Sequence, residues 1–240
     1  MVYKEKFKMQ LKDIGKDNYI KNRAILEIFE NIGTYHSDIA GYGPNDIKKT
    51  GLSWVLLDWK LQVLKRPKYG QTLNVNTWGR TMKRTYTYRD FEMYDEENNL
   101  CVIGTSKWGL VDINTGRITK ISEEIYEKYE IEEKSVFKIE ELDKLKVPET
   151  YASEITYKVS RRDIDINGHM HNLYYLDLAY EVLPEEVYEK RPFDNVTIQY
   201  KKEVKIGDII KCRYTFEEDK HIITICSADG AKIHAVIVLF

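Results

Sequence analysis

Near the start of the chain, apolar residues recur with the period of an α-helix. The apolar stripe consists of Ile20, Ala24, Ile25, Ile28, Phe29 and Ile32. Because residues three and four positions apart share one face of a helix, this spacing predicts a buried amphipathic helix over residues 20–32. We expect Asp17 or Asn18 to cap its start and Gly33 to end it.

The pattern then changes to a period of two. Apolar and polar residues alternate from Leu57 to Val63, as in a strand with one buried face. Further strand-like runs are Thr72–Arg80, Thr85–Tyr94 and Leu100–Asp112. Segments rich in Gly and Asn separate these runs and predict turns. A helix followed by antiparallel strands is the element order of an α+β fold.

The same order returns in the second half of the chain. Tyr174–Leu183 has the composition of a helix, which we expect Pro184 to end. Four strand-like runs follow, namely Asn195–Glu203, Asp208–Phe216, His221–Ser227 and Ala231–Phe240. Asp229-Gly230 predicts a tight hairpin between the last two.

The two halves can be aligned with each other. Asn22 matches Asn172 at a shift of 150 residues, whereas Lys68 matches Lys205 at a shift of 137. We expect the extra residues of the first half to lie at 35–50. The chain is therefore predicted to hold two tandem repeats of helix and sheet. They are residues 1–122 and 151–240, joined by a charged connector at 123–150.

Composition narrows the class of protein. The chain has 240 residues, of which 42% are hydrophobic, so it can form substantial cores. The 37 basic and 39 acidic residues give a net charge of −2, which does not indicate a nucleic-acid partner. No signal-peptide core and no membrane-spanning apolar run is present, so we expect a cytoplasmic protein. The three cysteines and the histidines lack metal-ligand spacing, so neither a metal nor another cofactor is expected.

The densest group of reactive side chains precedes the second helix. Asp165, Asn167 and His169 lie two residues apart, so an extended or looping backbone would turn all three to one side. Gly168 permits a sharp turn, and Asn172 is a candidate helix cap. A helix N-terminus can stabilise a developing oxyanion, and histidine exchanges protons near neutral pH. Loop-forming and packing roles remain open for the same residues.

Longer motifs resemble a known family. Residues 161–176 read R-R-D-I-D-I-N-G-H-M-H-N-L-Y-Y-L, and residues 196–203 read V-T-I-Q-Y-K-K-E. Both resemble the signatures of the acyl-ACP thioesterases of plant plastids and bacteria. Shorter matches in the first half, such as Trp54-Val55 and Ser106-Lys107-Trp108, extend the resemblance over residues 1–215.

The resemblance implies a double hotdog fold, in which each repeat is an antiparallel sheet wrapped around a helix. It implies catalytic roles for Asp165, Asn167, His169 and Glu203, with Asp165 holding His169. Val204 stands where plant enzymes often have Cys, so a cysteine nucleophile is not available there. In the first repeat the positions equivalent to Asp165, Asn167 and His169 are Gly15, Asp17 and Tyr19, so one active site per chain is expected.

The implied activity is hydrolysis of fatty acyl thioesters on acyl carrier protein. An acyl-CoA thioesterase, a non-catalytic acyl-thioester binding module and a hotdog dehydratase are the alternatives, and both monomer and homodimer are open. The expected acyl pocket lies in the first repeat, lined by the 20–32 helix, Trp54, Leu56 and Trp59. Basic residues expected to bind the acidic carrier protein are Arg161, Arg162, Lys201, Lys202 and Lys205, with Lys65, Arg66 and Lys68 in the first repeat.

Overall fold

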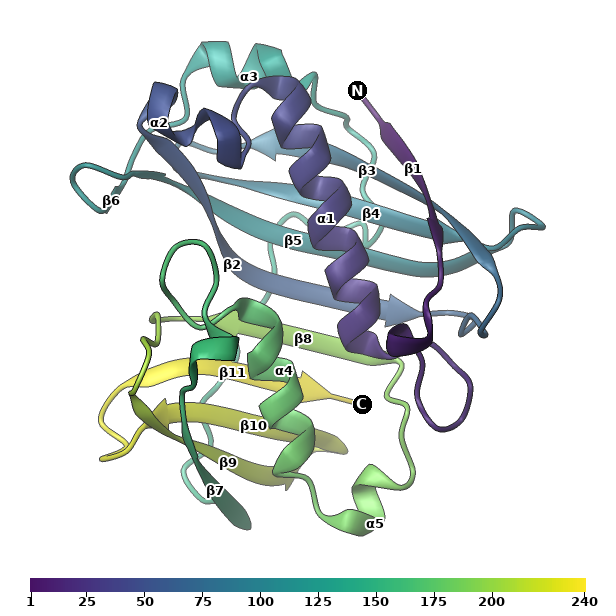
Figure 1. Ribbon diagram of the computed structural model, residues 1–240, viewed down its shortest axis with the longest axis vertical. Helices are drawn as coiled ribbons and strands as arrows, with labels where there is room; N and C mark the ends of the chain where they lie inside the picture. The colour runs from purple at the N-terminus through teal and green to yellow at the C-terminus, as the bar shows by residue number, and fades with distance from the viewer. The chain divides into compact units, whose positions relative to one another are not determined.

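The computed structural model describes residues 1–240 and divides into two compact units, Met1–Glu141 and Leu142–Phe240 (Figure 1). The division falls inside the stretch that the sequence predicts as a connector. No helix in the structure is long and apolar enough to span a membrane.

In unit 1 an antiparallel sheet is packed against one long helix. The strands are β1 (Tyr3–Lys8), β2 (Leu52–Val63), β3 (Thr72–Met82), β4 (Tyr86–Tyr94), β5 (Leu100–Asp112) and β6 (Arg117–Ile118). They pair in the order β1-β3-β4-β5-β2, with β6 added to β5. The helices are α1 (Asn22–Ala40), α2 (Ile47–Thr50) and α3 (Glu123–Tyr129), with short 3-10 turns at Leu11–Asp13 and Pro44–Asp46.

Helix α1 is longer than its apolar pattern predicts. It passes through Gly33 and ends at Ala40, where Gly41 takes the left-handed conformation of a C-cap. Gly33 is enclosed instead, because a Cβ there would lie 3.2 Å from the Cδ atom of Arg89. The expected cap was also wrong, since Lys21 occupies the N-cap position and makes no side-chain cap bond.

Aromatic side chains fill the space between α1 and the sheet. Phe29 of α1 stacks on Phe91 of β4 with ring centroids 4.7 Å apart, and Trp59 of β2 lies 5.3 Å from Phe91. All three are fully buried. Burial of such large apolar surfaces is the main stabilising contribution to this unit.

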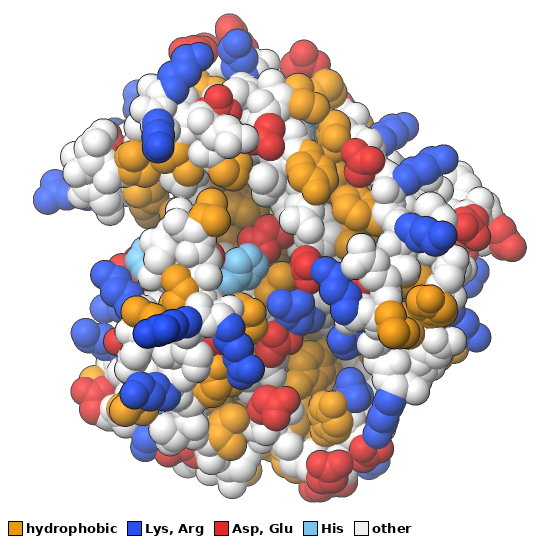
Figure 2. All heavy atoms as spheres, viewed as in Figure 1, with side chains coloured by type: hydrophobic (Ala, Val, Ile, Leu, Met, Phe, Trp, Pro, Cys, Tyr) orange, Lys and Arg blue, Asp and Glu red, His pale blue; other side chains and the backbone are white.

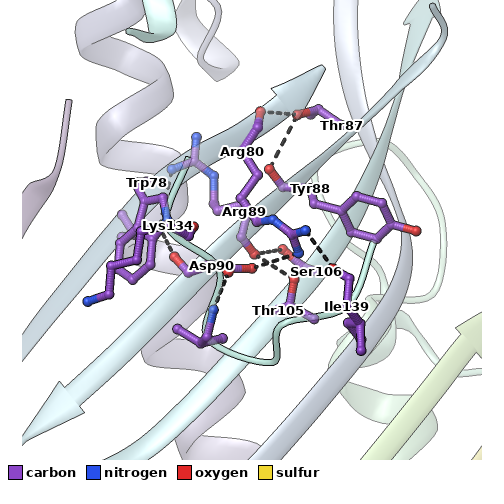
Figure 3. A network of polar contacts seen from close by, with 12 residues as sticks. Trp78, Arg80, Thr87, Tyr88, Arg89, Asp90, Thr105, Ser106, Lys134 and Ile139 are labelled. Carbon is purple, nitrogen blue, oxygen red and sulfur yellow. Dashed lines mark hydrogen bonds and ion pairs between the residues drawn. The ribbon is translucent and has the colours of Figure 1, made fainter. Parts of the chain in front are cut away.

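The first part of the predicted connector belongs to unit 1. Tyr129 of α3 is buried and donates a hydrogen bond to Ser37 of α1. The following residues are fastened to β3 and β4 by the polar network in Figure 3. In it the Val136 amide donates to the Asp90 carboxylate at 2.9 Å, and Arg80 donates to the Ile139 carbonyl at 2.7 Å.

Unit 2 repeats this design with a shorter helix. Its strands are β7 (Ser153–Lys158), β8 (Asn195–Tyr200), β9 (Ile209–Glu217), β10 (Lys220–Ser227) and β11 (Ile233–Leu239). They pair in the order β8-β11-β10-β9-β7. The helices are α4 (Asn172–Glu181) and α5 (Glu185–Tyr188), with a 3-10 turn at Arg161–Asp163. In Figure 1, α4 lies across the face of this sheet.

Tight turns connect the strands of unit 2. The predicted hairpin at Asp229-Gly230 is confirmed, since β10 and β11 pair antiparallel around it. A second hairpin joins β9 to β10 through Glu218 and Asp219, which both have positive φ. Strand β8 ends at Tyr200, earlier than predicted, so Glu203 lies in the loop that follows it.

The backbone confirms the internal repeat. Strands β1 and β7 have the same length at a shift of 150 residues, and α1 and α4 both begin at the matched asparagines. Gly70 and Gly207, matched at the shift of 137, have φ values of 88° and 84°. The α+β class with two hotdog repeats is therefore confirmed.

Candidate active site

A tight turn places the three motif residues ahead of α4. The Gly168 amide donates to the Asp165 carbonyl at 3.1 Å, and the Asp165 amide donates to the His169 carbonyl at 2.8 Å. Gly168 has a φ of 79°, a conformation that favours glycine. The turn therefore projects Asn167 to the surface and leaves His169 half-buried.

The Asp165 carboxylate holds the backbone of this turn. It accepts hydrogen bonds from the amides of Asn167 at 2.8 Å and His169 at 3.1 Å. The Asn167 side-chain amide also donates to it at 3.4 Å. Asp165 thus holds His169 through its main-chain amide, and an orienting contact with the imidazole stays a prediction.

His169 faces the carboxylate of Glu203. The distance from Nε2 of His169 to Oε1 of Glu203 is 3.7 Å, with side chains 34% and 60% exposed. A backbone bridge pairs His169 with Lys205, and the Met170 amide donates to the Val204 carbonyl at 2.8 Å. These bonds hold the loop after β8 against the turn, so two residues distant in sequence meet.

The contact between His169 and Glu203 can contribute little to stability, and its two groups are of the types that exchange protons. An ion pair this exposed contributes at most about 1 kcal/mol to folding. Imidazole and carboxylate are the side chains that most often act as general acid and base. Separations longer than a hydrogen bond are common before substrate binds, and they leave room for a reacting group. Lys205 adds a positive charge, with its Nζ atom 3.9 Å from Oε1 of Glu203.

The first turn of α4 borders the same carboxylates. His171, and not Asn172 as expected, is the N-cap, since its Nδ1 atom accepts from the Leu173 amide at 3.3 Å. Tyr175 is buried, and burial together with the negative charges of Glu203 and Asp165 raises its pKa. Tyr175 was not predicted, although its position one turn after Asn172 could have indicated it.

The buried carboxylate of Asp163 stabilises the backbone that leads into this turn. Asp163 is 1% exposed and accepts hydrogen bonds from the Ser160 amide and the Tyr157 hydroxyl, both at 2.7 Å. No pattern in the sequence indicates these contacts. They fix the backbone immediately before Asp165.

Neither a thiol nor a metal-binding cluster accompanies the pair. Val204 is buried beside Glu203, and Cys101, Cys212 and Cys226 are all buried. Burial raises the pKa of Cys212 to about 12. No group of three or more His, Cys, Asp or Glu side chains is placed to hold a metal ion.

Exposed basic residues flank the motif and Glu203 in the sequence of unit 2. All five predicted docking residues of this unit, Arg161, Arg162, Lys201, Lys202 and Lys205, are exposed. In the first repeat Arg66 is engaged instead, because it donates to the Ile20 carbonyl at 2.9 Å. Figure 2 shows basic, acidic and apolar side chains interspersed over the visible face, in keeping with the small net charge.

The predicted acyl-pocket residues lie within unit 1. Leu56 and Trp59 are buried, whereas Trp54 is half-buried and donates through Nε1 to the Tyr129 hydroxyl at 2.8 Å. These contacts place the three residues in the packing of unit 1.

Comparison with known proteins identifies the relatives of the chain. The profile of the acyl-ACP thioesterase N-terminal domain matches residues 1–129, and that of the C-terminal domain matches residues 147–240. Oleoyl-acyl carrier protein thioesterase 1 of Arabidopsis thaliana is 24% identical over 225 residues, covering 87% of this chain and 62% of the relative. The palmitoyl-acyl carrier protein thioesterase of Cuphea hookeriana is 24% identical over 215 residues, covering 85% of this chain and 52% of the relative.

Solved structures share the fold. An acyl-ACP thioesterase from Bacteroides thetaiotaomicron superposes with a TM-score of 0.88 at 19% identity, covering 100% of this chain and 97% of the other. The 12:0-ACP thioesterase from Umbellularia californica gives 0.86 at 20% identity, covering 99% and 96%. The chain thus spans under two thirds of the Arabidopsis and Cuphea relatives but nearly all of these two structures.

Proposed function

The chain belongs to the acyl-ACP thioesterase family, and we propose that it hydrolyses the thioester of a fatty acyl chain carried on acyl carrier protein. The observation that carries this proposal is the approach of His169 Nε2 to Glu203 Oε1 at 3.7 Å. Release of free fatty acid would end chain elongation in fatty acid synthesis. A cytoplasmic location is proposed on the sequence alone.

The proposed reaction begins with attack of water on the thioester carbonyl. Glu203 removes a proton from the water, the carbon–oxygen bond forms, and the developing oxyanion is stabilised by the positive end of the α4 dipole. The carbon–sulfur bond then breaks, and the carrier thiol leaves with a proton passed through His169. Asn167 binds the carbonyl or orients the water. Asp165 maintains the turn that carries Asn167 and His169.

A second route gives Glu203 a covalent role. In it a carboxylate oxygen attacks the thioester carbon, and the carbon–sulfur bond breaks, so that the carrier thiol leaves with a proton passed through His169. Water then cleaves the resulting anhydride into free fatty acid and the regenerated Glu203 carboxylate. Single-turnover hydrolysis in ¹⁸O-labelled water separates the routes. Label recovered in the Glu203 carboxylate would exclude simple water attack.

Docking of the carrier is proposed to involve the exposed cations around the site. Acyl carrier protein is acidic, so Arg161, Arg162, Lys201, Lys202 and Lys205 would attract it. The acyl chain is proposed to bind along the inner face of α1 in unit 1.

The proposal is tested by substituting the pair and measuring turnover of a length series of acyl-ACP substrates. We expect Glu203→Gln and His169→Asn each to lower kcat at least about 100-fold, the usual loss of a general acid or base. Glu217→Gln and His221→Asn are matched controls in the same unit, outside the site, and should retain activity. Wild-type turnover by either site variant would disprove the assignment. Faster turnover of acyl-CoA than of acyl-ACP would show that the substrates are acyl-CoA thioesters.

A further inference from the structure

The internal repeat shows which residues of the two units occupy matched positions. In unit 1 the Ile20 amide donates to the Pro67 carbonyl at 3.0 Å, and in unit 2 the Met170 amide donates to the Val204 carbonyl at 2.8 Å. These bonds fix the same backbone register in both units. The residue before Pro67 is Arg66, so Arg66 is the structural counterpart of Glu203.

The Arg66 guanidinium lies beside the start of α1 and bonds to it. Its Nη1 atom donates to Oδ1 of Asn22 at 2.8 Å and to the Ile20 carbonyl at 2.9 Å. Asn22 is the first residue of α1, as Asn172 is the first residue of α4. Glutamate is shorter than arginine and, when ionised, donates no hydrogen bond. No hydrogen bond joins Glu203 to Asn172 in unit 2, although the matched register sets these two residues at the positions of Arg66 and Asn22 in unit 1.

Contacts of α4 support this placement independently. Tyr175, one turn beyond Asn172, is buried, and its pKa is raised by that burial and then by the negative charge of Glu203. The Tyr200 hydroxyl donates to the Asn172 carbonyl at 3.0 Å, which anchors the start of the helix through its main chain. The side-chain amide of Asn172 is half-buried and is not part of any hydrogen bond within the protein.

We propose that Asn172 is a further catalytic residue, whose Oδ1 atom accepts a hydrogen bond from the attacking water. The water donates its other O–H to Glu203, so its lone pair is directed at the thioester carbon. This inference rests on the proposed thioester hydrolysis. It assigns to the water in unit 2 the place that the guanidinium of Arg66 fills in unit 1.

Three substitutions test the role of Asn172. Asn172→Ala should lower kcat on the order of 100-fold with little change in KM, because the water loses its orienting acceptor. Asn172→Asp keeps an acceptor oxygen and should recover part of kcat. Like-charge repulsion from the added carboxylate should move the acidic limb of the kcat–pH profile to higher pH. Asn22→Ala, the matched change in unit 1, should lower Tm by removing the Arg66 contact and leave kcat unchanged.

The outcomes separate this inference from the proposed function. If Asn172→Ala keeps wild-type kcat while Glu203→Gln and His169→Asn are inactive, Asn172 has no catalytic role and the function stands. If those two variants are active, the proposed function itself fails. Suppose instead that Asn172→Ala loses kcat while Asn172→Asp neither recovers kcat nor shows a shifted kcat–pH profile. That result would overturn the inference and give Asn172 a structural role. Tm is measured for each variant, and Asn172→Ser serves in place of the alanine variant if that variant does not fold.

Discussion

At the scale of single residues, the role of a carboxylate depends on which atoms reach it. Asp165 could be singled out from the sequence because Asp-x-Asn-x-His is a compact group of reactive side chains. Its partner could not be predicted, because an aspartate oxygen reaches the amide two residues ahead as readily as a side chain. In the structure the turn takes up both Asp165 oxygens, and His169 is left to face Glu203.

His36 is a buried residue that no sequence pattern indicated. It is fully buried on α1, and Nη1 of Arg89 donates to its Nδ1 atom at 2.8 Å. Because arginine only donates, Nδ1 must be the unprotonated nitrogen of a neutral ring. Burial, and then the charge of Arg89, lowers the pKa of His36 to about 3.

The lowered pKa of His36 predicts a loss of stability in mild acid. Below its ordinary pKa of about 6.5 the unfolded chain binds a proton at His36 that the folded chain does not bind until about pH 3. Stability should therefore fall as pH falls through this window. Between pH 7 and pH 5, we expect the wild type to lose about 2 kcal/mol more unfolding free energy than His36→Gln. Urea titrations at both pH values measure this difference, and equal losses in the two proteins would contradict it.

At the scale of elements, the strands were predicted better than the helix ends. Strand β5 has the predicted bounds, because turn-forming residues flank a continuous apolar run. The end of α1 was predicted wrongly because, in the sequence alone, Gly33 has the features of a residue that ends a helix. Only the fold shows that the Arg89 side chain lies against it. Glu203 was predicted to end a strand, yet its distance from His169 depends on the loop after Tyr200, which periodicity does not describe.

The cap of α4 gives a prediction at this scale. Because the His171 ring accepts the Leu173 amide, His171→Ala should destabilise the protein by about 1 kcal/mol, the usual cost of losing an N-cap. His171→Asn supplies another acceptor and should retain stability. Thermal unfolding of the two variants measures the cap. An alanine variant as stable as the asparagine variant would show that the ring bond contributes nothing.

At the scale of the whole molecule, the repeat was visible in the sequence and its asymmetry became clear in the structure. The shifts of 150 and 137 residues are both reproduced by matched backbone bonds, so the duplication could be predicted from few identities. The exchange of Glu203 for Arg66 could in principle be read from the same alignment. The consequence of this exchange could be interpreted only from the hydrogen bond between Arg66 and Asn22, because that bond depends on how the loop packs against the helix.

Charge distribution gives a prediction for substrate capture. The net charge of −2 cannot attract an acidic carrier, so any attraction must come from the local cations around the site. Raising salt from about 0.02 M to 0.3 M should lower kcat/KM for acyl-ACP about tenfold through screening, with kcat little changed. The double variant Lys201→Glu/Lys202→Glu should flatten this salt dependence, while Lys232→Glu in the same unit should not. An unchanged kcat/KM across the salt range would rule out electrostatic docking.

The three buried cysteines also affect how this protein can be handled. Cys101, Cys212 and Cys226 are enclosed by packed side chains, and burial raises the pKa of each thiol. Alkylating reagents act on exposed thiolates, so they would leave the native chain unmodified. One cysteine introduced at an exposed position such as Lys232 would then carry a fluorophore or spin label alone, without first removing the natural thiols.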